Sequence, residues 1–290
     1  MTTNAAHGIT STHTTDSPTA DTHLVLGGTG KTGRRVAERL AARGASVRIG
    51  SRSGTPRFDW TDQRTWEPVL REVTAAYVAY APDISAPDAA EHIGALGELA
   101  AAHDVRLVLL SGRGMASARP AERALRESGA AWTILRCDWF AQNFSEEFLR
   151  DLVLAGEIAL PTGEVPTPFV DADDIAEVAT TVLLDPGHAG AVHELTGPRS
   201  LTVREATAEI AAATGRELRY LPVSADEFVA GMVGAGVPAE LAGMVAAIFT
   251  ETFDGRNTEP TDDVRRLLGR EARDFADYAR STAPTGVWRG

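Results

Sequence analysis

Cysteine and lysine are almost missing from this chain. One of its 290 residues is a cysteine, Cys137, and one is a lysine, Lys31, so arginine supplies nearly all of the 28 lysine and arginine side chains. A single cysteine excludes a disulfide bridge within the chain. Proteins of a reducing compartment do without such bridges, and we therefore expect a cytoplasmic protein.

Long apolar runs and an excess of positive charge are missing too. No apolar stretch approaches the roughly 20 residues of a membrane-spanning helix, and the N-terminus has no signal-peptide pattern. The net charge of −12 argues against nucleic acid or an anionic membrane as a partner. No histidine, cysteine and acid spacing matches a metal site, so we predict none. Residues 1–21 are rich in threonine and serine, which predicts a disordered extension.

What the chain does have is a glycine-rich turn between a short apolar strand at 24–26 and a helix. Gly27, Gly30 and Gly33 let the chain turn tightly, approach phosphates closely and pack the helix against the sheet. An ATP-binding P-loop is excluded, because Val25 stands where its first glycine belongs. A second strand at 46–50 completes a βαβ unit of dinucleotide-binding type. The predicted cofactor contacts here are Gly27, Thr29, Gly30, Lys31, Thr32, Gly33 and Arg34, with Ala79 and Ser111 from the ends of later strands.

The end of the second strand decides the type of cofactor. A site that prefers NAD places an acidic residue there to bind the ribose hydroxyls, whereas residues 50–53 of this chain read Gly-Ser-Arg-Ser. Arg52 can bind a 2′-phosphate, with Ser51 and Ser53 as further donors. The sequence favours NADPH, and a solvated surface arginine is the alternative for Arg52.

Short apolar segments then alternate with amphipathic helices. Strands are predicted at 57–59, 75–79, 106–110, 132–136 and 192–195, and helices at 65–73, 87–102 and 120–128. Continuously apolar strands are buried on both faces, as in a parallel sheet covered by helices. We predict an α/β fold with a Rossmann-type, doubly wound parallel sheet over residues 22–200, and ligands at the carboxyl ends of its strands.

The last third of the chain is predicted to form a smaller, mainly helical lobe, residues 201–290, with part of 138–170 contributing to the substrate site. Helices are expected at 202–213, 225–233 and 238–253, and a strand near 218–221. The helix at 238–253 is apolar over most of its circumference. It is either a core helix or a lid over an apolar substrate, with Met244 and Phe249 as candidate contacts.

Several motifs together resemble a known family. They are the glycine turn, Leu109-Leu110-Ser111, Ala121-Glu122-Arg123-Ala124-Leu125, Trp132-Thr133-Ile134-Leu135-Arg136, Phe140-x-x-Asn143-Phe144 and Phe169-Val170-Asp171-x-Asp173-Asp174-Ile175-Ala176. Over residues 23–285 the chain resembles the NmrA-like atypical short-chain dehydrogenase/reductases. It is similar there to reductases of secondary metabolism, such as the ergot-alkaloid iminium reductases and the angucyclinone ketoreductase of simocyclinone biosynthesis. The resemblance implies a Rossmann fold, a nicotinamide cofactor and an oxidoreductase.

The chain departs from the wider superfamily in its catalytic residues. Standard members use a serine and a Tyr-x-x-x-Lys pair, whose tyrosine protonates the carbonyl oxygen. Ser111 stands where the family serine belongs, but residues 112–132 contain neither tyrosine nor lysine. We predict that Ser111 and Arg113 stabilise the carbonyl oxygen, with the proton supplied by water, Tyr80 or the substrate itself.

For several other candidate side chains the sequence allows two alternative roles. Asp59 contacts the adenine or caps a turn, and Arg136 reaches the cofactor or pairs with an acid. Residues after 136 line the substrate pocket or belong to the core, and the candidates are Trp139, Phe140, Asn143 and Phe144. Asp171, Asp173 and Asp174 are predicted to cap a helix rather than to bind a metal.

Two classes of function follow. The first is an NADPH-dependent ketoreductase of antibiotic biosynthesis, a monomer or weak homodimer, acting on a bulky, apolar, polycyclic or aromatic ketone of polyketide type. The second is a redox-sensing regulator of the NmrA type, which binds the cofactor without turnover. A quinone or iminium reductase is a further alternative. Ser111 and the apolar C-terminal lobe favour the enzyme, whereas the missing Tyr and Lys favour the regulator.

Overall fold

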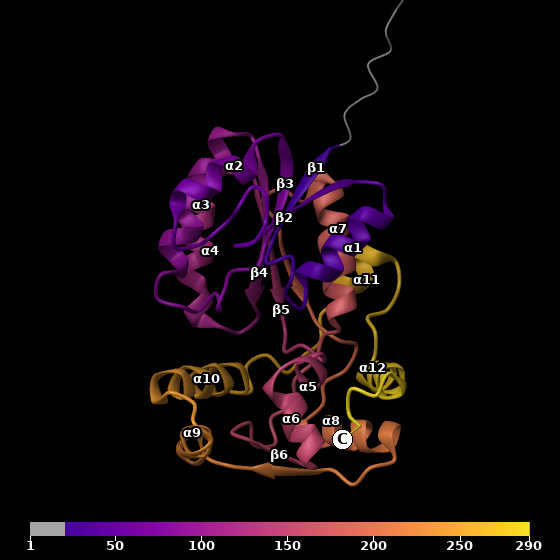
Figure 1. The fold of residues 1–290 in the computed structure, drawn as a ribbon. Helices are drawn as coiled ribbons and strands as arrows, with labels where there is room; N and C mark the ends of the chain where they lie inside the picture. Colours follow the sequence, from indigo (N-terminus) through magenta and orange to yellow (C-terminus); the bar gives the residue numbers. More distant parts are fainter. Residues whose placement is uncertain (1–20, 290) are drawn as a thin grey trace, which may run out of the picture.

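A central sheet of six parallel strands organises the molecule (Figure 1). The computed structural model describes residues 21–289, so the predicted extension lies outside the described residues except for Asp21. The strand order is β2-β1-β3-β4-β5-β7, and every neighbouring pair is parallel. The strands are β1 (Thr22–Leu26), β2 (Ser46–Gly50), β3 (Val73–Val78), β4 (Arg106–Gly112), β5 (Trp132–Cys137) and β7 (Val192–Leu195). The predicted doubly wound parallel sheet is thus confirmed.

Helices cover both faces of this sheet. One face carries α2 (Trp66–Leu70), α3 (Ala89–Ala102) and α4 (Arg119–Glu127), and the other carries α1 (Gly33–Ala42), α7 (Ala172–Leu184) and α11 (Asp263–Leu268) (Figure 1). Leu24 and Leu26 pack into the core on one face, whereas Val25 packs into the core on the other. A strand between two helical layers must therefore be apolar at every position, which explains the unbroken run in the sequence.

One predicted strand is wrong. Residues 57–59 form no strand, and the chain passes from β2 to β3 through turns, the short 3-10 helix η1 (Gln63–Thr65) and α2. Phe58 is buried, but it packs against Trp60 and Trp66, with ring centroids 4.9 and 6.2 Å away. Phe58 therefore belongs to an aromatic cluster beside the sheet and not to a strand within it.

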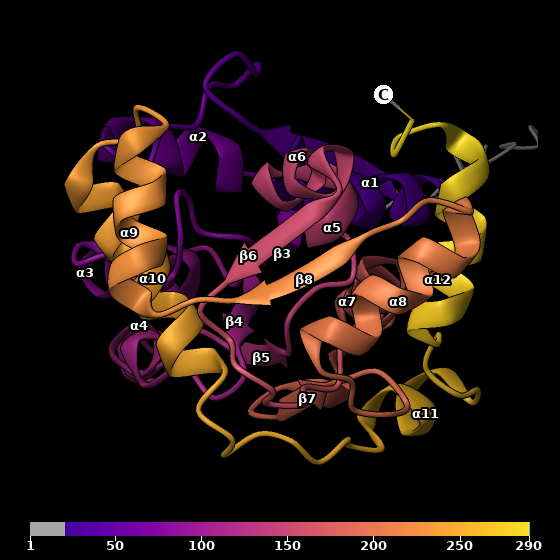
Figure 2. The same cartoon turned by 90° about the horizontal axis from the view of Figure 1, so that it is seen from below.

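A second lobe lies beyond the carboxyl ends of the strands (Figures 1 and 2). Its parallel strands β6 (Glu157–Leu160) and β8 (Arg219–Pro222) pair with each other, and its core contains Phe144, Phe249 and Trp288. The helices of this lobe are α5 (Asn143–Glu146), α6 (Phe148–Ala155), α8 (Val203–Thr214), α9 (Ala225–Gly234), α10 (Ala239–Thr252) and α12 (Phe275–Thr282), and the 3-10 helix η4 (Ala283–Thr285) packs against α8 and α12. The 3-10 helices η2 (Ala116–Ala118) and η3 (Pro186–His188) lie elsewhere. The domain boundary at 200/201 stays a prediction. No helix among the described residues is long and apolar enough to cross a membrane.

Candidate active site

A cavity of about 600 Å³ opens at the carboxyl ends of β1, β3, β4 and β5. It begins between the turn after β1 and the loop after β3, where the winding of the sheet reverses, which is the usual ligand position in this architecture. From there it continues to the side chains of α10. One half is lined by Gly27, Thr29, Gly30, Lys31, Thr32 and residues 79–84, and the other by Ser111, Met115, Trp139, Phe140, Asn143, Phe148, Leu241, Met244, Val245 and Ile248, among others.

The glycine turn leaves a cradle without side chains at the start of this cavity. A Cβ on Gly33 would lie 2.2 Å from the carbonyl oxygen of Gly27, so α1 can begin this close to the turn only with glycine there. Gly27 has a φ of +76°, and its Cβ would lie 3.0 Å from the carbonyl oxygen of Ala79. The first turn of α1 carries no acidic residue that would oppose an anion at its N-terminus. These residues fit a dinucleotide pyrophosphate.

Lys31 turns from this cradle toward the second lobe. Its ammonium donates to Asn143 Oδ1, lies 3.1 Å from Glu147 Oε1 and stands 5.7 Å from the centroid of the Phe140 ring. Burial lowers the pKa of Lys31, as does the charge of Arg35, and the nearby carboxylates only partly oppose this. Lys31 lines the cavity, and its predicted contact with the cofactor stays a prediction.

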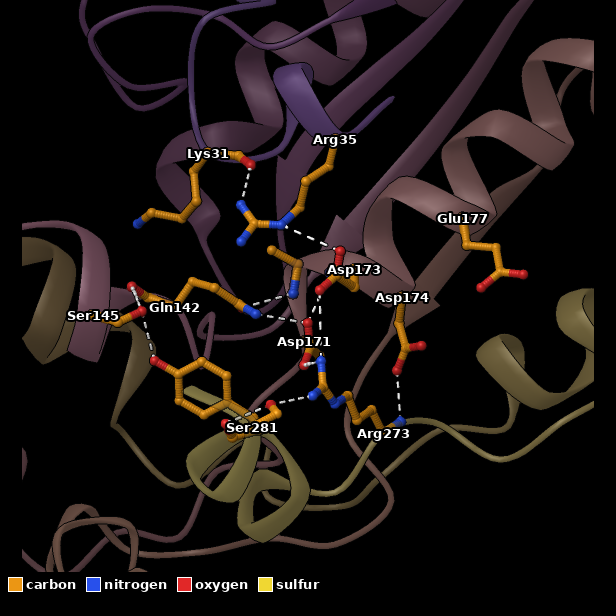
Figure 3. Close-up of polar contacts among 12 residues, drawn as sticks. Lys31, Arg35, Gln142, Ser145, Asp171, Asp173, Asp174, Glu177, Arg273 and Ser281 are labelled. Carbon is orange, nitrogen blue, oxygen red and sulfur yellow. Dashed lines mark hydrogen bonds and ion pairs between the residues drawn. The ribbon is translucent and has the colours of Figure 1, made fainter. Parts of the chain in front are cut away.

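Two arginines that follow the turn are bound in the same region. Arg34 Nη2 lies 2.6 Å from Glu146 Oε2, and Arg35 Nη2 lies 2.7 Å from Glu146 Oε1. Arg35 also donates to the Lys31 carbonyl at 2.7 Å and lies 3.3 Å from Asp173 (Figure 3). Arg34 is thus a partner of Glu146 and is not among the residues that line the cavity, which disfavours its predicted cofactor contact.

Asp171 caps α7, and Asp173 and Asp174 lie in the first turn of that helix, in agreement with the prediction. Asp171 accepts a hydrogen bond from the Asp173 N–H at 2.8 Å and another from Gln142 Nε2 at 2.7 Å. Arg273 Nη1 lies 3.0 Å from Asp171, and the Arg273 N–H donates to Asp174 (Figure 3). Burial raises the pKa of Asp171 despite these donors. No group of metal-binding side chains occurs within residues 21–289.

In the segment that follows β2, the guanidinium of Arg52 is available to bind a ligand. Arg52 is exposed, and it forms no hydrogen bond or ion pair within the described part of the chain. Ser53 is exposed beside it, and Ser51 is half-buried. Asp59 caps a turn, accepting from the Thr61 side chain and backbone and pairing with Arg57 at 2.6 Å. The turn-capping alternative therefore describes Asp59, and these bonds hold its pKa below the usual range.

Ser111 and Arg136 both bind a buried acid. Ser111 Oγ donates to Glu122 Oε1 at 2.7 Å, and Arg136 donates to the two oxygens of Glu122 at 3.0 and 2.7 Å. Burial disfavours the charged form of Glu122, yet hydrogen bonds from Arg136 and Ser111 and the charge of Arg119 hold its pKa below the ordinary value. The predicted cofactor contact of Arg136 is wrong. Ser111 lines the cavity, but its one donor is already used.

Arg113 is a structural residue rather than a source of charge for a ligand. It is only 8% exposed, and Asp138 and Glu194 each lie 3.1 Å from its guanidinium. The remaining donors bind the carbonyl oxygens of Asn257 and Glu259, both at 2.9 Å. Arg113 thus fastens the segment after α10 to the sheet. It also lines the cavity, but its donors are bound within the protein, which disfavours its predicted role at the carbonyl oxygen.

Tyr80 lines the cavity, but its hydroxyl is paired with a histidine. Tyr80 Oη lies 2.7 Å from His92 Nδ1 on α3, and its ring packs against Trp60. Burial raises the pKa of Tyr80 well above the ordinary value, with Asp88 adding to this effect. Both features disfavour release of its proton to a ligand.

Some of the residues predicted to contact the substrate line the cavity, and others lie in the core. Trp139, Phe140, Asn143 and Met244 line the cavity. Phe144 and Phe249 do not, because both are fully buried in the core of the second lobe. Sequence reasoning missed Glu147, Phe148, Leu241, Val245 and Ile248. The signal for three of them was present, since Leu241, Met244, Val245 and Ile248 are spaced to share one face of α10.

No family model matches the chain. The uncharacterized oxidoreductase YesF of Bacillus subtilis (strain 168) is 32% identical to it over 278 residues, which are 91% of this chain and 97% of that protein. Agroclavine dehydrogenase of Claviceps fusiformis is 29% identical, over 92% of this chain and 98% of its own. The chain belongs to the NmrA-like family of atypical short-chain dehydrogenase/reductases.

Two solved structures have the same fold as this chain. Triphenylmethane reductase of Citrobacter sp., complexed with NADP(H), matches with a TM-score of 0.70 at 22% identity, over 90% of this chain and 99% of that one. The negative transcriptional regulator NmrA matches with a TM-score of 0.66 at 18% identity, over 92% and 97% of the two chains. Proteins of this fold therefore include both a reductase and a transcriptional regulator.

Proposed function

We propose that this protein is an NADPH-dependent reductase of a bulky, largely apolar acceptor with a conjugated carbonyl group. One observation carries the proposal: the glycine cradle and the apolar face of α10 line the same cavity. A volume of about 600 Å³ lies within the range of small-molecule sites. A regulator that only binds a dinucleotide has no need of the half lined by Leu241, Met244 and Ile248.

The residues of the turn would hold the cofactor. The backbone from Gly27 to Gly33 offers N–H groups to the pyrophosphate, and the free guanidinium of Arg52 suits a 2′-phosphate. When bound, NADPH supplies the hydride of the reaction. The NADP(H) complex of triphenylmethane reductase supports this choice of cofactor.

The other half of the cavity selects the acceptor. Trp139, Met244 and Ile248 supply apolar surface that binds flat, apolar molecules and excludes water. The donors of Ser111 and Arg113 are occupied by Glu122, Asp138 and their neighbours, so neither supplies a free donor for an isolated oxyanion. An acceptor that spreads the developing negative charge over a conjugated system suits this half of the cavity best. Quinones and polycyclic ketones of polyketide type, as in antibiotic biosynthesis, have this property.

NADPH oxidation tests the function directly. We expect the protein to oxidise NADPH, followed at 340 nm, with at least one member of a panel of naphthoquinones, anthraquinones and polycyclic ketones. Met244→Trp should fill the cavity and lower this turnover about tenfold or more while NADPH still binds. Leu221→Trp, at an exposed position outside the cavity, is the matched control. NADPH binding without turnover across the panel would instead support the regulator.

Replacing Arg52 should change the preference between the two nicotinamide cofactors. Because a charge-assisted hydrogen bond contributes about 1.5–3 kcal/mol, Arg52→Ala should weaken NADPH binding tenfold or more and leave NADH binding unchanged. Calorimetric titration with each cofactor measures both affinities. Arg57→Ala is the control, since that exposed arginine is already paired with Asp59. Equal losses for the two cofactors would contradict the assignment of Arg52 to the 2′-phosphate.

A further inference from the structure

Lys31, the one lysine of the chain, lies where the two halves of the cavity meet. It follows Gly30 in the cofactor turn, yet its ammonium contacts Asn143 and Glu147 at the start of the second lobe. Both of these residues and Phe140 line the cavity together with Lys31. The Lys31 side chain is only 10% exposed, so solvent does not compete strongly for its charge.

The hydrogen bonds of this ammonium leave room for a ligand. An ammonium group has three N–H bonds. Asn143 Oδ1 and Glu147 Oε1 accept two of them, and within residues 21–289 the third has no acceptor. Lys31 differs in this respect from Ser111, Arg113 and Tyr80, whose polar groups are all paired within the protein.

The position of Lys31 is fixed by its neighbours. Arg35 donates to the Lys31 carbonyl at 2.7 Å and is itself tied to Glu146 and Asp173 (Figure 3). The backbone that carries the ammonium is therefore anchored to α5 and α7. A donor held in this way needs little reorganisation when a ligand enters.

Given the proposed reductase function, we infer that Lys31 is the catalytic residue that protonates the acceptor oxygen. In this step a C–H bond forms at the acceptor carbon with the hydride from the cofactor, and the C=O π electrons move to the oxygen. The oxygen takes a proton from the Lys31 ammonium. The neutral amine that remains regains a proton from water by way of Glu147, whose side chain is 58% exposed. Lys31 thus replaces the missing Tyr-x-x-x-Lys pair.

The electrostatic surroundings suit a proton donor. Burial is the main reason that the pKa of Lys31 is lowered, and Arg35 acts in the same direction. Glu147 and Glu146 oppose the lowering of this pKa. A general acid works best when its pKa lies nearer to the operating pH than that of an exposed lysine.

Two substitutions separate proton donation from charge. Lys31→Met removes both, and Lys31→Arg keeps the charge in a group that does not release a proton at neutral pH. We expect both variants to lose about 10²-fold in kcat with a polycyclic ketone acceptor, while NADPH affinity stays within threefold. Arg43→Met, at the exposed end of α1, is the control and should keep wild-type turnover. Wild-type turnover in Lys31→Arg, or loss of NADPH binding in both variants, would overturn the inference.

A readout without turnover is available because the chain has a single lysine. Labelling with ¹³Cε-lysine gives one side-chain resonance, whose pH titration reports the pKa of Lys31 directly. We expect a midpoint below that of an exposed lysine, and a midpoint at or above it would overturn the inference. Failure of the proposed function is distinguishable from failure of this inference. In that case none of the acceptors in the panel would support NADPH oxidation by the wild-type protein, while the titration would still report the pKa of Lys31.

Discussion

Gly33→Ala should lower NADPH affinity by roughly 100-fold, equivalent to about 2.7 kcal/mol. The added Cβ would lie 2.2 Å from the Gly27 carbonyl oxygen and 2.9 Å from Gly28 Cα, distances at which backbone atoms must move. Either α1 shifts away from the turn or the turn itself opens. Both changes displace the N–H groups that face the pyrophosphate. Overpacking of this kind also destabilises the fold by about 1–3 kcal/mol.

Isothermal titration with NADPH and thermal unfolding measure the two effects of Gly33→Ala. Gly243→Ala is the matched control, because no atom lies within 4 Å of its added Cβ and it too stands in a helix. Alanine in a helix interior is favoured over glycine by about 1 kcal/mol, so this control should be slightly stabilised. Unchanged NADPH affinity in Gly33→Ala would show that the cradle is not the pyrophosphate site.

Arg113→Met should cost about 3–5 kcal/mol of unfolding free energy. The substitution leaves the carboxylate of Asp138, which is 3% exposed, without its cationic partner. It also frees Glu194 and the carbonyl oxygens of Asn257 and Glu259, and so loosens the segment that follows α10. Removing one member of a buried ion pair is costly because the other charge stays desolvated.

Urea unfolding of three variants tests this account of Arg113. Arg204→Met removes an exposed partner of Glu164 and should change stability by less than about 1 kcal/mol. Arg113→Met combined with Asp138→Asn should recover part of the loss, since no buried carboxylate is then left unpaired. A stable Arg113→Met protein that has lost only turnover would instead return Arg113 to a catalytic role.

The elements that sequence reasoning found are those whose patterns are local. β4 and β5 extend only slightly beyond the predicted residues, because each contains a short apolar run next to polar residues. β7 also lies at the predicted residues, although two of its four residues are polar. The segment Arg57-Phe58-Asp59 was misleading, since its single apolar side chain does not show whether a sheet neighbour exists. β6 was missed for a related reason: its partner is β8, about sixty residues later, and neither strand is long enough to stand out alone.

The same distinction between local patterns and distant contacts applies to the candidate site. The glycine turn was recognised because its function depends on backbone geometry within seven residues. The roles of Ser111 and Arg113 were misjudged because their partners lie elsewhere: Glu122 is 11 residues from Ser111, and Glu194 is 81 residues from Arg113. A chain rich in arginine and acids offers many such pairs, and only the fold decides which form. The contact between Lys31 and residues 143–147 is beyond sequence reasoning for the same reason.

The apolar face of α10 that lines the cavity has a consequence for the divergence of this family. Leu241, Met244, Val245 and Ile248 belong to one helix that makes no hydrogen bonds to the central sheet, whereas the cofactor cradle is built from the β1–α1 turn, some two hundred residues earlier. Substitutions on this helix face can therefore reshape the acceptor site while leaving nicotinamide binding intact. A fold built in this way lets evolution exchange substrates by changing a few side chains, which accords with relatives that are named for chemically unlike molecules.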